Sequence, residues 1–409
     1  MAETELHLAV EVMSEQLTIN GLLRRFEALE RELFAELLDA AQQQHLRAVR
    51  QGEAPEIECP RCGSEYWVKR GSRHRQLTTS QGELTFPLRQ VTCSHCDRTW
   101  SPFVERLGLE PRQRASEELR EKLVGLVTEV SYRKASRFGE EQFGATLSAM
   151  EIWRTVQRRA REISFTANGD GPARLEVDGT QAPAGPDTHG EAVNLAFQVG
   201  DRRRENGRWR RSKRLVGLGM SDWSRALPEV LSPDLVVNDG GGDVCRAVAA
   251  TYTEARFQRC EWHLVYGLDK ALWNDGVEYK IRGRLQRELH ERVFGGGEGR
   301  DRRADIRAWA ADRLGTYERA RSLVTSAVGE VCYEPPSSLR TTSHAEREMR
   351  ELNRRTDVGA RWTIRGVRNL LRLRFARRCN PDDYARLWND HNSSLTVEAR
   401  SPGASMSTR

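Results

Sequence analysis

Residues 173–179 read Ala-Arg-Leu-Glu-Val-Asp-Gly, a short apolar strand pattern that ends on the acid Asp178. A second run of this kind, Leu235-Val-Val-Asn-Asp, ends on Asp239 and is followed by three glycines. Open α/β sheets place their ligands at the ends of strands, and glycine lets the backbone approach a phosphate closely. We therefore expect the two carboxylates to meet at one end of a sheet, with Asp243 as the alternative to Asp239.

A third acid, Glu346, opens a charged helical stretch within Thr-Thr-Ser-His-Ala-Glu-Arg-Glu. Carboxylate oxygens are the natural ligands of Mg²⁺, which completes its coordination shell with water and substrate phosphate. Two such ions, Mg²⁺ or Mn²⁺, can serve both the attacking and the leaving oxygen of a phosphodiester. The sequence thus predicts a catalytic, metal-binding trio, in which Glu348 and Glu351 compete with Glu346 for the third place.

Composition sets broad limits on the partners. The chain has 409 residues, with 65 Lys and Arg against 59 Asp and Glu, for a net charge of +6. Its length predicts several modules, and its charge favours a polyanionic partner. No apolar run approaches the roughly 18 residues that a membrane span needs, and residues 1–16 lack the apolar core of a signal peptide. We expect a cytoplasmic, nucleoid-associated protein without a membrane partner.

Four of the eight cysteines form two close pairs, Cys59 with Cys62 and Cys93 with Cys96. The segment between the pairs has a turn at Ser80-Gln-Gly and then alternates apolar and polar residues, which predicts a β-hairpin. In a reducing compartment such pairs indicate metal binding before disulfides. Four thiolates complete the tetrahedral shell of Zn²⁺, so the sequence predicts a zinc ribbon with a structural ion.

Helical patterns lie on both sides of this ribbon. Before it, apolar residues recur at helical spacing and predict one or two amphipathic helices for packing or self-association. After it, three short helices beginning near Ser116 fit a helix-turn-helix-like module, whose last helix would bring Arg154 and Arg158 to DNA. A helical spacer with a solvated basic face is the alternative for this module.

A basic hairpin is predicted around Asn206-Gly207, a strong tight-turn dipeptide. A basic tip that carries an aromatic ring can grip phosphates and stack on bases, although a solvated loop has the same composition. The candidate DNA-binding residues of this hairpin are Arg202, Arg203, Arg204, Arg208, Trp209, Arg210 and Arg211.

The order of these features resembles the DDE transposases, most closely the Mutator-type insertion-sequence transposases. The resemblance rests on Cys260-Glu-Trp-His263 about twenty residues after Asp239, on a helical stretch to about Val331, and on the segment from Thr341 through Glu346 to Asn353-Arg-Arg-Thr. It implies an α/β catalytic core, a ribonuclease H-like mixed sheet with an all-helical insertion, preceded by helical and zinc-ribbon modules.

The resemblance also implies roles for residues and partners. Asp178, Asp239 and Glu346 would hold the ions while water cleaves the element's end, after which the freed 3′-hydroxyl attacks target DNA. The partners would be terminal repeats, target DNA and, because two ends are synapsed, further copies of the chain. Cys260 and His263 alone are too few for zinc, so packing or DNA positioning is preferred to metal binding. The third accessory candidate, His344, is either a DNA contact or incidental.

The predicted modules are residues 1–52, N-terminal amphipathic helices; 53–106, zinc ribbon; 107–168, helix-turn-helix-like DNA binding; 169–264, first part of the ribonuclease H-like core; 265–335, helical insertion; 336–392, catalytic Glu helix; and 393–409, disordered tail. Two alternatives to a transposase stay open. One is a domesticated, non-catalytic, sequence-specific DNA-binding protein, and the other is a ribonuclease H-like nuclease.

Overall fold

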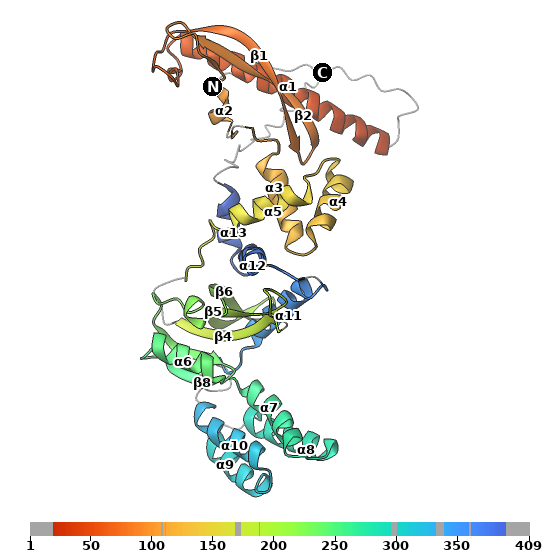
Figure 1. Ribbon diagram of the computed structural model, residues 1–409, viewed down its shortest axis with the longest axis vertical. Coiled ribbons are helices and arrows are strands. Elements are labelled where there is room, and N and C mark those ends of the chain that lie inside the picture. Colours follow the sequence, from red (N-terminus) through yellow and green to blue (C-terminus); the bar gives the residue numbers. More distant parts are fainter. Residues whose placement is uncertain are drawn as a thin grey trace, which may run out of the picture. The chain divides into compact units, whose positions relative to one another are not determined.

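The computed structural model describes residues 19–107, 109–110, 112–167, 173–187, 189–295, 301–332, 339–359 and 361–389. The chain forms two compact units, Met1–Thr155 with Trp388–Arg409, and Val156–Leu387 (Figure 1). The predictions for the start of the chain before residue 19, the linker at 169–172, the boundary at 335–336 and the tail after 392 lie outside the described residues.

The first unit begins with one long helix that packs on a small antiparallel sheet. The helix is α1 (Ile19–Arg50), and the sheet has the order β1 (Trp67–Thr79), β2 (Gly82–Cys93), β3 (Thr99–Trp100). Alternate residues of β2 are buried, as the period of two in a strand requires. The predicted hairpin is confirmed, since Thr79 pairs with Gly82 across the turn.

Four helices follow in this part of the chain, α2 (Phe103–Arg106), α3 (Glu117–Val127), α4 (Tyr132–Phe143) and α5 (Ala149–Arg159). The side chains of Ser116 and Ser131 cap α3 and α4 by accepting a backbone N–H, which satisfies one of the open donors at each helix start. The three predicted helices α3 to α5 are confirmed. The sequence pattern predicts the last two helices at Ser131–Phe138 and Ser148–Ile163. Instead, α4 continues to Phe143, where Gly144 at φ 61° ends it, and α5 ends at Arg159.

The second unit is built on a five-stranded mixed sheet. Its order is β6-β5-β4-β7-β8, with β4, β5 and β6 antiparallel and with β7 and β8 parallel to β4. The strands are β4 (Ala173–Ala182), β5 (Glu191–Glu205), β6 (Arg208–Met220), β7 (Pro233–Asn238) and β8 (Arg256–Arg259). The chain is therefore a mixed α/β protein.

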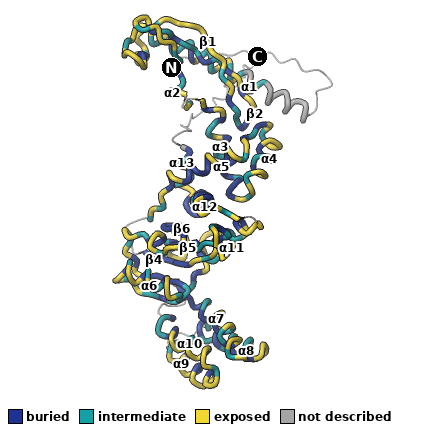
Figure 2. Tube along the Cα trace, viewed as in Figure 1, coloured by how far each residue is buried: buried dark blue, intermediate teal, exposed yellow. Residues whose placement is uncertain are grey.

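Helices cover both faces of this sheet. One face packs on α6 (Gly242–Thr251), and the other packs on α11 (Ser343–Thr356) and α12 (Ile364–Cys379) (Figure 1). Figure 2 shows burial concentrated along the sheet strands and α12. In β4 the alternation sends Leu175 and Val177 to the α6 face, which leaves Glu176 and Asp178 on the α11 face.

The predicted helical region after β8 is also confirmed. It consists of α7 (Glu261–Asn274), α8 (Tyr279–Phe294), α9 (Arg302–Arg313) and α10 (Glu318–Ala327), which share a core of their own. Short 3-10 turns lie at Trp223–Arg225 (η2) and Val328–Glu330 (η3), and α13 (Pro381–Asn389) follows α12. Among the described residues no helix combines the length and the apolar character needed to cross a membrane.

Two predictions of secondary structure need correction. The apolar pattern predicts strands at Ala192–Val199 and Leu215–Met220 on the two sides of Asn206-Gly207, but β5 runs to Glu205 and β6 begins at Arg208. Backbone pairing continues through the arginine-rich segment because β-ladder hydrogen bonds do not depend on apolar side chains. The helix α6 was missed because it starts directly after glycines, where no side-chain cap marks its beginning.

Candidate metal and catalytic site

The parallel register of β4 and β7 brings the two aspartates together. Leu175 lies opposite Val236 and Glu176 opposite Val237. The same register extended by two residues puts Asp178 opposite Asp239, one position beyond the end of β7. The two carboxylates interact electrostatically. The sheet pairing therefore puts the two aspartates at neighbouring positions, next to the carboxyl end of β7.

The surroundings of Asp178 disfavour its ionised form. Its side chain is buried, and its Oδ1 accepts the Gly179 N–H at 2.8 Å. Burial raises the pKa of Asp178 to about 6; the charge of Asp239 acts in the same direction, while His263 and Thr342 oppose it. A buried carboxyl beside a like charge favours a state in which a proton or a cation is shared.

Asp239 and its rival Asp243 lie close to each other but differ in their partners. Asp239 Oδ1 accepts the Gly241 N–H at 2.9 Å, and a Cβ on Gly241 would lie 3.2 Å from an oxygen of each acid. Asp243, in the first turn of α6, accepts the Trp223 indole N–H at 3.2 Å. Asp239 is the one that interacts with Asp178.

Glu346 meets a cysteine and a histidine. Ligand atoms of Cys260, His263 and Glu346 all lie within 4.8 Å of one another, and His263 Nε2 is 3.6 Å from Glu346 Oε1. Burial alone would lower the pKa of His263, but the Cys260 sulfur, Asp178 and Glu346 together raise it to about 9. Asp178 and Glu346 thus both favour the protonated form of His263.

The start of α7 is tied to the segment that leads into α11. The Thr342 N–H and hydroxyl point to the Cys260 sulfur, at 3.4 and 3.5 Å. The neighbouring Glu261 is fully buried, pairs with the Arg340 guanidinium and donates its N–H to the Arg340 carbonyl at 3.1 Å. These contacts set where Glu346 stands relative to His263.

A second carboxylate, Glu176, positions α11 on β4. It is fully buried, and its Oε2 accepts the N–H groups of His344 and Ala345 at 2.9 and 3.0 Å. Its Oε1 lies 2.7 Å from His344 Nδ1. A carboxylate at a helix N-terminus is stabilised by the open amides there, so His344 takes part in anchoring the helix. The spacing of two residues from Asp178 in a strand is the signal that could have pointed to Glu176.

The rival acids on α11 are engaged elsewhere. Glu348 is buried and contacts Lys213 Nζ at 2.5 Å and Arg378 Nε at 2.9 Å. Burial opposes its ionisation, yet these two cations keep the pKa of Glu348 below its usual range. Glu351 pairs with Arg354 at 2.5 Å. Of the three glutamates of this helix, Glu346 is the one beside His263.

The four cysteines of the first unit are gathered in one cluster. Their sulfur atoms lie within 4.8 Å of one another, with 3.6 Å from Cys59 to Cys96 and 3.6 Å from Cys62 to Cys93. Zn–S bonds of about 2.3 Å in a regular tetrahedron put sulfurs about 3.8 Å apart. The cluster therefore could bind Zn²⁺, with all four positions filled by protein.

The basic hairpin presents most of its arginines to solvent, whereas Arg211 is half-buried and donates to the Gly200 carbonyl at 3.3 Å. Asn206 and Gly207 have φ values of 49° and 76°, which is the turn that a two-residue hairpin favours. Across the strands Arg202 lies opposite Arg211 and Arg203 opposite Arg210.

Like charges facing each other repel unless an anion lies between them. The Arg202 guanidinium carbon lies 5.2 Å from the centre of the Trp209 ring, and Trp209 lies opposite Arg204. Arg208, beside the turn, is exposed as well.

The predicted arginines of α5 are exposed too. Arg154 reaches Glu151 on its own helix at 3.7 Å, and Arg158 lies one turn further on. Their placement is compatible with either of the two readings of this helix, a groove contact or a solvated basic face.

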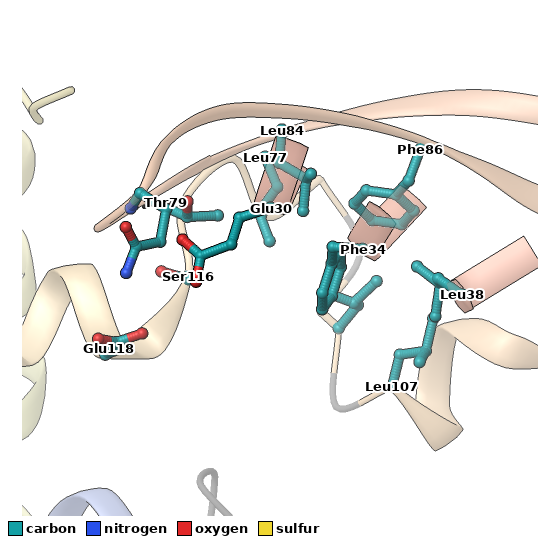
Figure 3. A pocket seen from close by; sticks show the side chains of 12 residues that line it. Glu30, Phe34, Leu38, Leu77, Thr79, Leu84, Phe86, Leu107, Ser116 and Glu118 are labelled. Carbon is teal, nitrogen blue, oxygen red and sulfur yellow. Dashed lines mark hydrogen bonds between the residues drawn. The ribbon is translucent and has the colours of Figure 1, made fainter. Parts of the chain in front are cut away.

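A hollow of about 410 Å³ lies in the first unit between α1 and the β1–β2 hairpin (Figure 3). Apolar side chains form most of its wall, with Phe34, Leu38 and Phe86 among them. It contains none of the predicted ligands or catalytic residues. Its lining fits the packing of a helix on a sheet and offers little to a metal ion or a phosphate.

Neither the protein-family models nor the curated proteins compared with this chain match it. The chemistry of its sites is therefore the basis for a function of this protein.

Proposed function

We propose that this chain is a DDE-type DNA transposase that cleaves the ends of an insertion sequence and joins them to target DNA, using Mg²⁺ or Mn²⁺ held by Asp178, Asp239 and Glu346. The proposal is supported by the register that brings Asp178 and Asp239 to neighbouring strand ends, and by His263, which interacts with Asp178 and lies 3.6 Å from Glu346. In this proposal, three segments far apart in sequence would supply the oxygen donors of one metal site.

The donor set fits hard divalent ions. Asp178 and Asp239 are adjacent carboxylates, and the burial of Asp178 makes an uncompensated pair of charges unfavourable. When bound, paired ions would activate the attacking oxygen and stabilise the leaving one of a phosphodiester. The chain's own part is to fix the carboxylates, through the β4–β7 register and through Glu176 at the start of α11.

The architecture around the acids supports the same proposal. The mixed sheet bears the first two acids, the helices α7 to α10 separate the second acid from the third, and Glu346 lies on the helix that follows. This is the order that the resemblance to Mutator-type transposases implies for a ribonuclease H-like core. The family and the activity remain our proposal.

Two surfaces of the second unit suit a nucleic-acid partner. The β5–β6 hairpin offers opposed, exposed arginines for phosphates. On α7, three aromatic residues spaced by four and seven positions lie on one face of the helix and are exposed: Trp262 at 46%, Tyr266 at 66% and Trp273 at 63%. Exposed aromatic rings can stack on unpaired bases, and the first of these, Trp262, is the neighbour of His263 in the chain. We further propose that a homo-oligomer brings two DNA ends together.

The direct test uses supercoiled DNA that carries the sequences flanking the gene. In the presence of Mg²⁺, wild type should yield cut ends and strand-joined products, whereas Asp178→Asn, Asp239→Asn and Glu346→Gln should lose both by at least about 100-fold. The matched control is Asp234→Asn, an exposed acid of β7 on the same strand. Full activity of Glu346→Gln, or loss of activity in Asp243→Asn with Asp239→Asn active, would overturn the assignment.

The products separate the alternatives. Cut ends without joined strands indicate a nuclease on this scaffold. Binding to the flanking DNA without any cleavage indicates a non-catalytic DNA-binding protein, for which the basic hairpin alone would suffice.

A further inference from the structure

Glu346 lies beside Cys260 and His263, whereas the proposed function assigns it to the ions of Asp178 and Asp239, and these two donor sets differ in chemical character. Asp178 and Asp239 offer oxygen only, which suits Mg²⁺. Cys260 and His263 offer sulfur and nitrogen, and their ligand atoms lie within 4.8 Å of each other and of a Glu346 oxygen. Thiolate and imidazole select a softer ion such as Zn²⁺ rather than Mg²⁺.

The distances fit a small tetrahedral ion. In a regular site with Zn–N and Zn–O bonds of about 2.1 Å, a histidine nitrogen and a carboxylate oxygen lie about 3.4 Å apart. The observed separation of His263 Nε2 from Glu346 Oε1 is 3.6 Å. Three protein ligands leave a fourth position for water, which is the open arrangement of a non-structural zinc site.

The Cys260 sulfur accepts hydrogen bonds from a neighbouring residue. Cys260 is fully buried at the end of β8, and the N–H and hydroxyl of the fully buried Thr342 both point to its sulfur, at 3.4 and 3.5 Å. Hydrogen bonds of this kind orient a metal-bound thiolate and are common around metal sites. The arrangement also goes beyond the two ligands, Cys260 and His263, that the sequence alone offers, because folding adds a third from α11.

We propose that Cys260, His263 and Glu346 form a second zinc site, separate from the four-cysteine cluster, and that zinc bound there withdraws Glu346 from the hard-ion site. The first part stands on the geometry alone. The second part rests on the proposed transposase function, since it assumes that Glu346 also binds Mg²⁺, and a Glu346 oxygen bound to zinc is not available to that ion. Zinc would then act as an inhibitor that competes with Mg²⁺.

The first experiment measures metal content and does not depend on activity. Full-length protein saturated with Zn²⁺ and freed of loose metal should carry about two ions per chain. Cys260→Ser and His263→Gln should each carry about one, and so should Cys62→Ser, which removes a ligand of the other cluster. Replacing zinc by Co²⁺ should give thiolate-to-metal absorption in wild type. This absorption should be weaker, but still present, in Cys260→Ser and in Cys62→Ser, because each variant keeps the other cysteine-containing site.

Thermal unfolding of each variant shows whether it is folded, and His263→Gln keeps the test valid if Cys260→Ser is not. A content of about one ion in wild type that is unchanged in folded Cys260→Ser and His263→Gln would overturn the proposal.

The second experiment addresses competition. In wild type, added Zn²⁺ should raise the Mg²⁺ concentration needed for half-maximal DNA cleavage severalfold, and in Cys260→Ser, whatever its own rate, Zn²⁺ should not shift that concentration. An equal shift in both proteins would refute competition through this site. If no cleavage is seen at all, the proposed transposase function fails while the metal-content result still decides the site.

Discussion

At the scale of single residues, α11 shows how neighbours separate the roles of similar side chains. Glu346 and Glu348 stand two positions apart, yet one faces His263 and the other lies buried between Lys213 and Arg378. Two positions on a helix are about 200° apart, so the two carboxylates point to different surroundings. The first is available to an ion, and the second is already neutralised by protein.

Replacing Glu348 should therefore reduce stability. Glu348→Gln leaves Lys213 and Arg378 without their shared carboxylate, and we expect a loss of roughly 2–3 kcal/mol in the free energy of unfolding. This is below the value for a fully buried pair because both cations are partly exposed. Urea denaturation measures it. Glu346→Gln is the matched control and should change stability by less than about 1 kcal/mol; an equal loss in both variants would contradict these roles.

The same ion pair predicts a dependence on pH. Because the folded protein holds the pKa of Glu348 below 4.5, the stabilisation is present above that value and is lost as the pH falls through the lowered folded pKa. The difference in unfolding free energy between wild type and Glu348→Gln should thus shrink as the pH is lowered from about 6 to about 3. A difference that stays constant over this range would show that the effect does not come from ionised Glu348.

The sequence offers the three candidate acids more readily than the residues that position them. Asp178, Asp239 and Glu346 could be named because acids that end apolar runs or open a helix stand out in one dimension. Glu176 could be inferred only from strand alternation. Arg340 and Thr342 could not be inferred from the sequence, because they act through contacts that only the folded chain creates. Arg340 contacts Glu261, 79 positions away, and Thr342 contacts Cys260, 82 positions away. The proximity of Cys260 and His263 to Glu346 likewise does not follow from the sequence, because more than 80 residues separate them along the chain.

At the scale of elements, the β5–β6 hairpin stands out because it pairs arginine with arginine. Apolar alternation ends near Val199, but the ladder continues to Glu205 and carries the charge away from the buried part of the sheet. Directly opposed like charges destabilise a strand pair, so these residues are poorly explained by folding alone. A polyanion bound along the hairpin would remove the repulsion.

Removing two of these charges should weaken binding to DNA. Arg203→Gln with Arg210→Gln should lower the affinity for duplex DNA and reduce the slope of log K against log salt concentration by about 2, since each phosphate contact contributes about 0.9. Arg287→Gln with Arg307→Gln removes the same charge from exposed positions of α8 and α9 and should leave the slope nearly unchanged. The same change of slope in both pairs would mean that only net charge matters.

The elements themselves were predictable to different degrees. The strands β4 and β7, the hairpin between the cysteine pairs and the helices from α7 to α10 follow from apolar periodicity. The exact ends of β5, β6 and α5 do not, because hydrogen-bond pairing and tertiary packing decide them. Nor does the sheet order, since the parallel pairing of β4 with β7 joins segments separated by more than 50 residues.

At the scale of the whole molecule, the chain has two compact units that differ in what stabilises them. The first combines α1, a small sheet and the four-cysteine cluster, and the second has the mixed sheet with helices on both faces. A three-stranded sheet is small and gains much from a metal ion, whereas the larger sheet buries its own core.

Loss of the four-cysteine zinc site should accordingly affect the first unit alone. In Cys62→Ser we expect the thermal transition of the first unit to fall by at least about 10 °C, because metal binding contributes directly to folding, while the transition of the second unit stays in place. Limited proteolysis should then cut preferentially within residues 53–106. A lowered transition of the second unit, or a first unit as stable as in wild type, would contradict a structural zinc site there.

The central claim is that Asp178, Asp239 and Glu346 hold divalent ions together. Crystals of the protein soaked in Mn²⁺, with the four-cysteine cluster filled by Zn²⁺, test it through the anomalous scattering of manganese. We predict manganese between the carboxylates of Asp178 and Asp239, with Glu346 completing the site, and its disappearance in Asp239→Asn. Manganese bound elsewhere, or the same manganese peak in Asp239→Asn, would contradict the account.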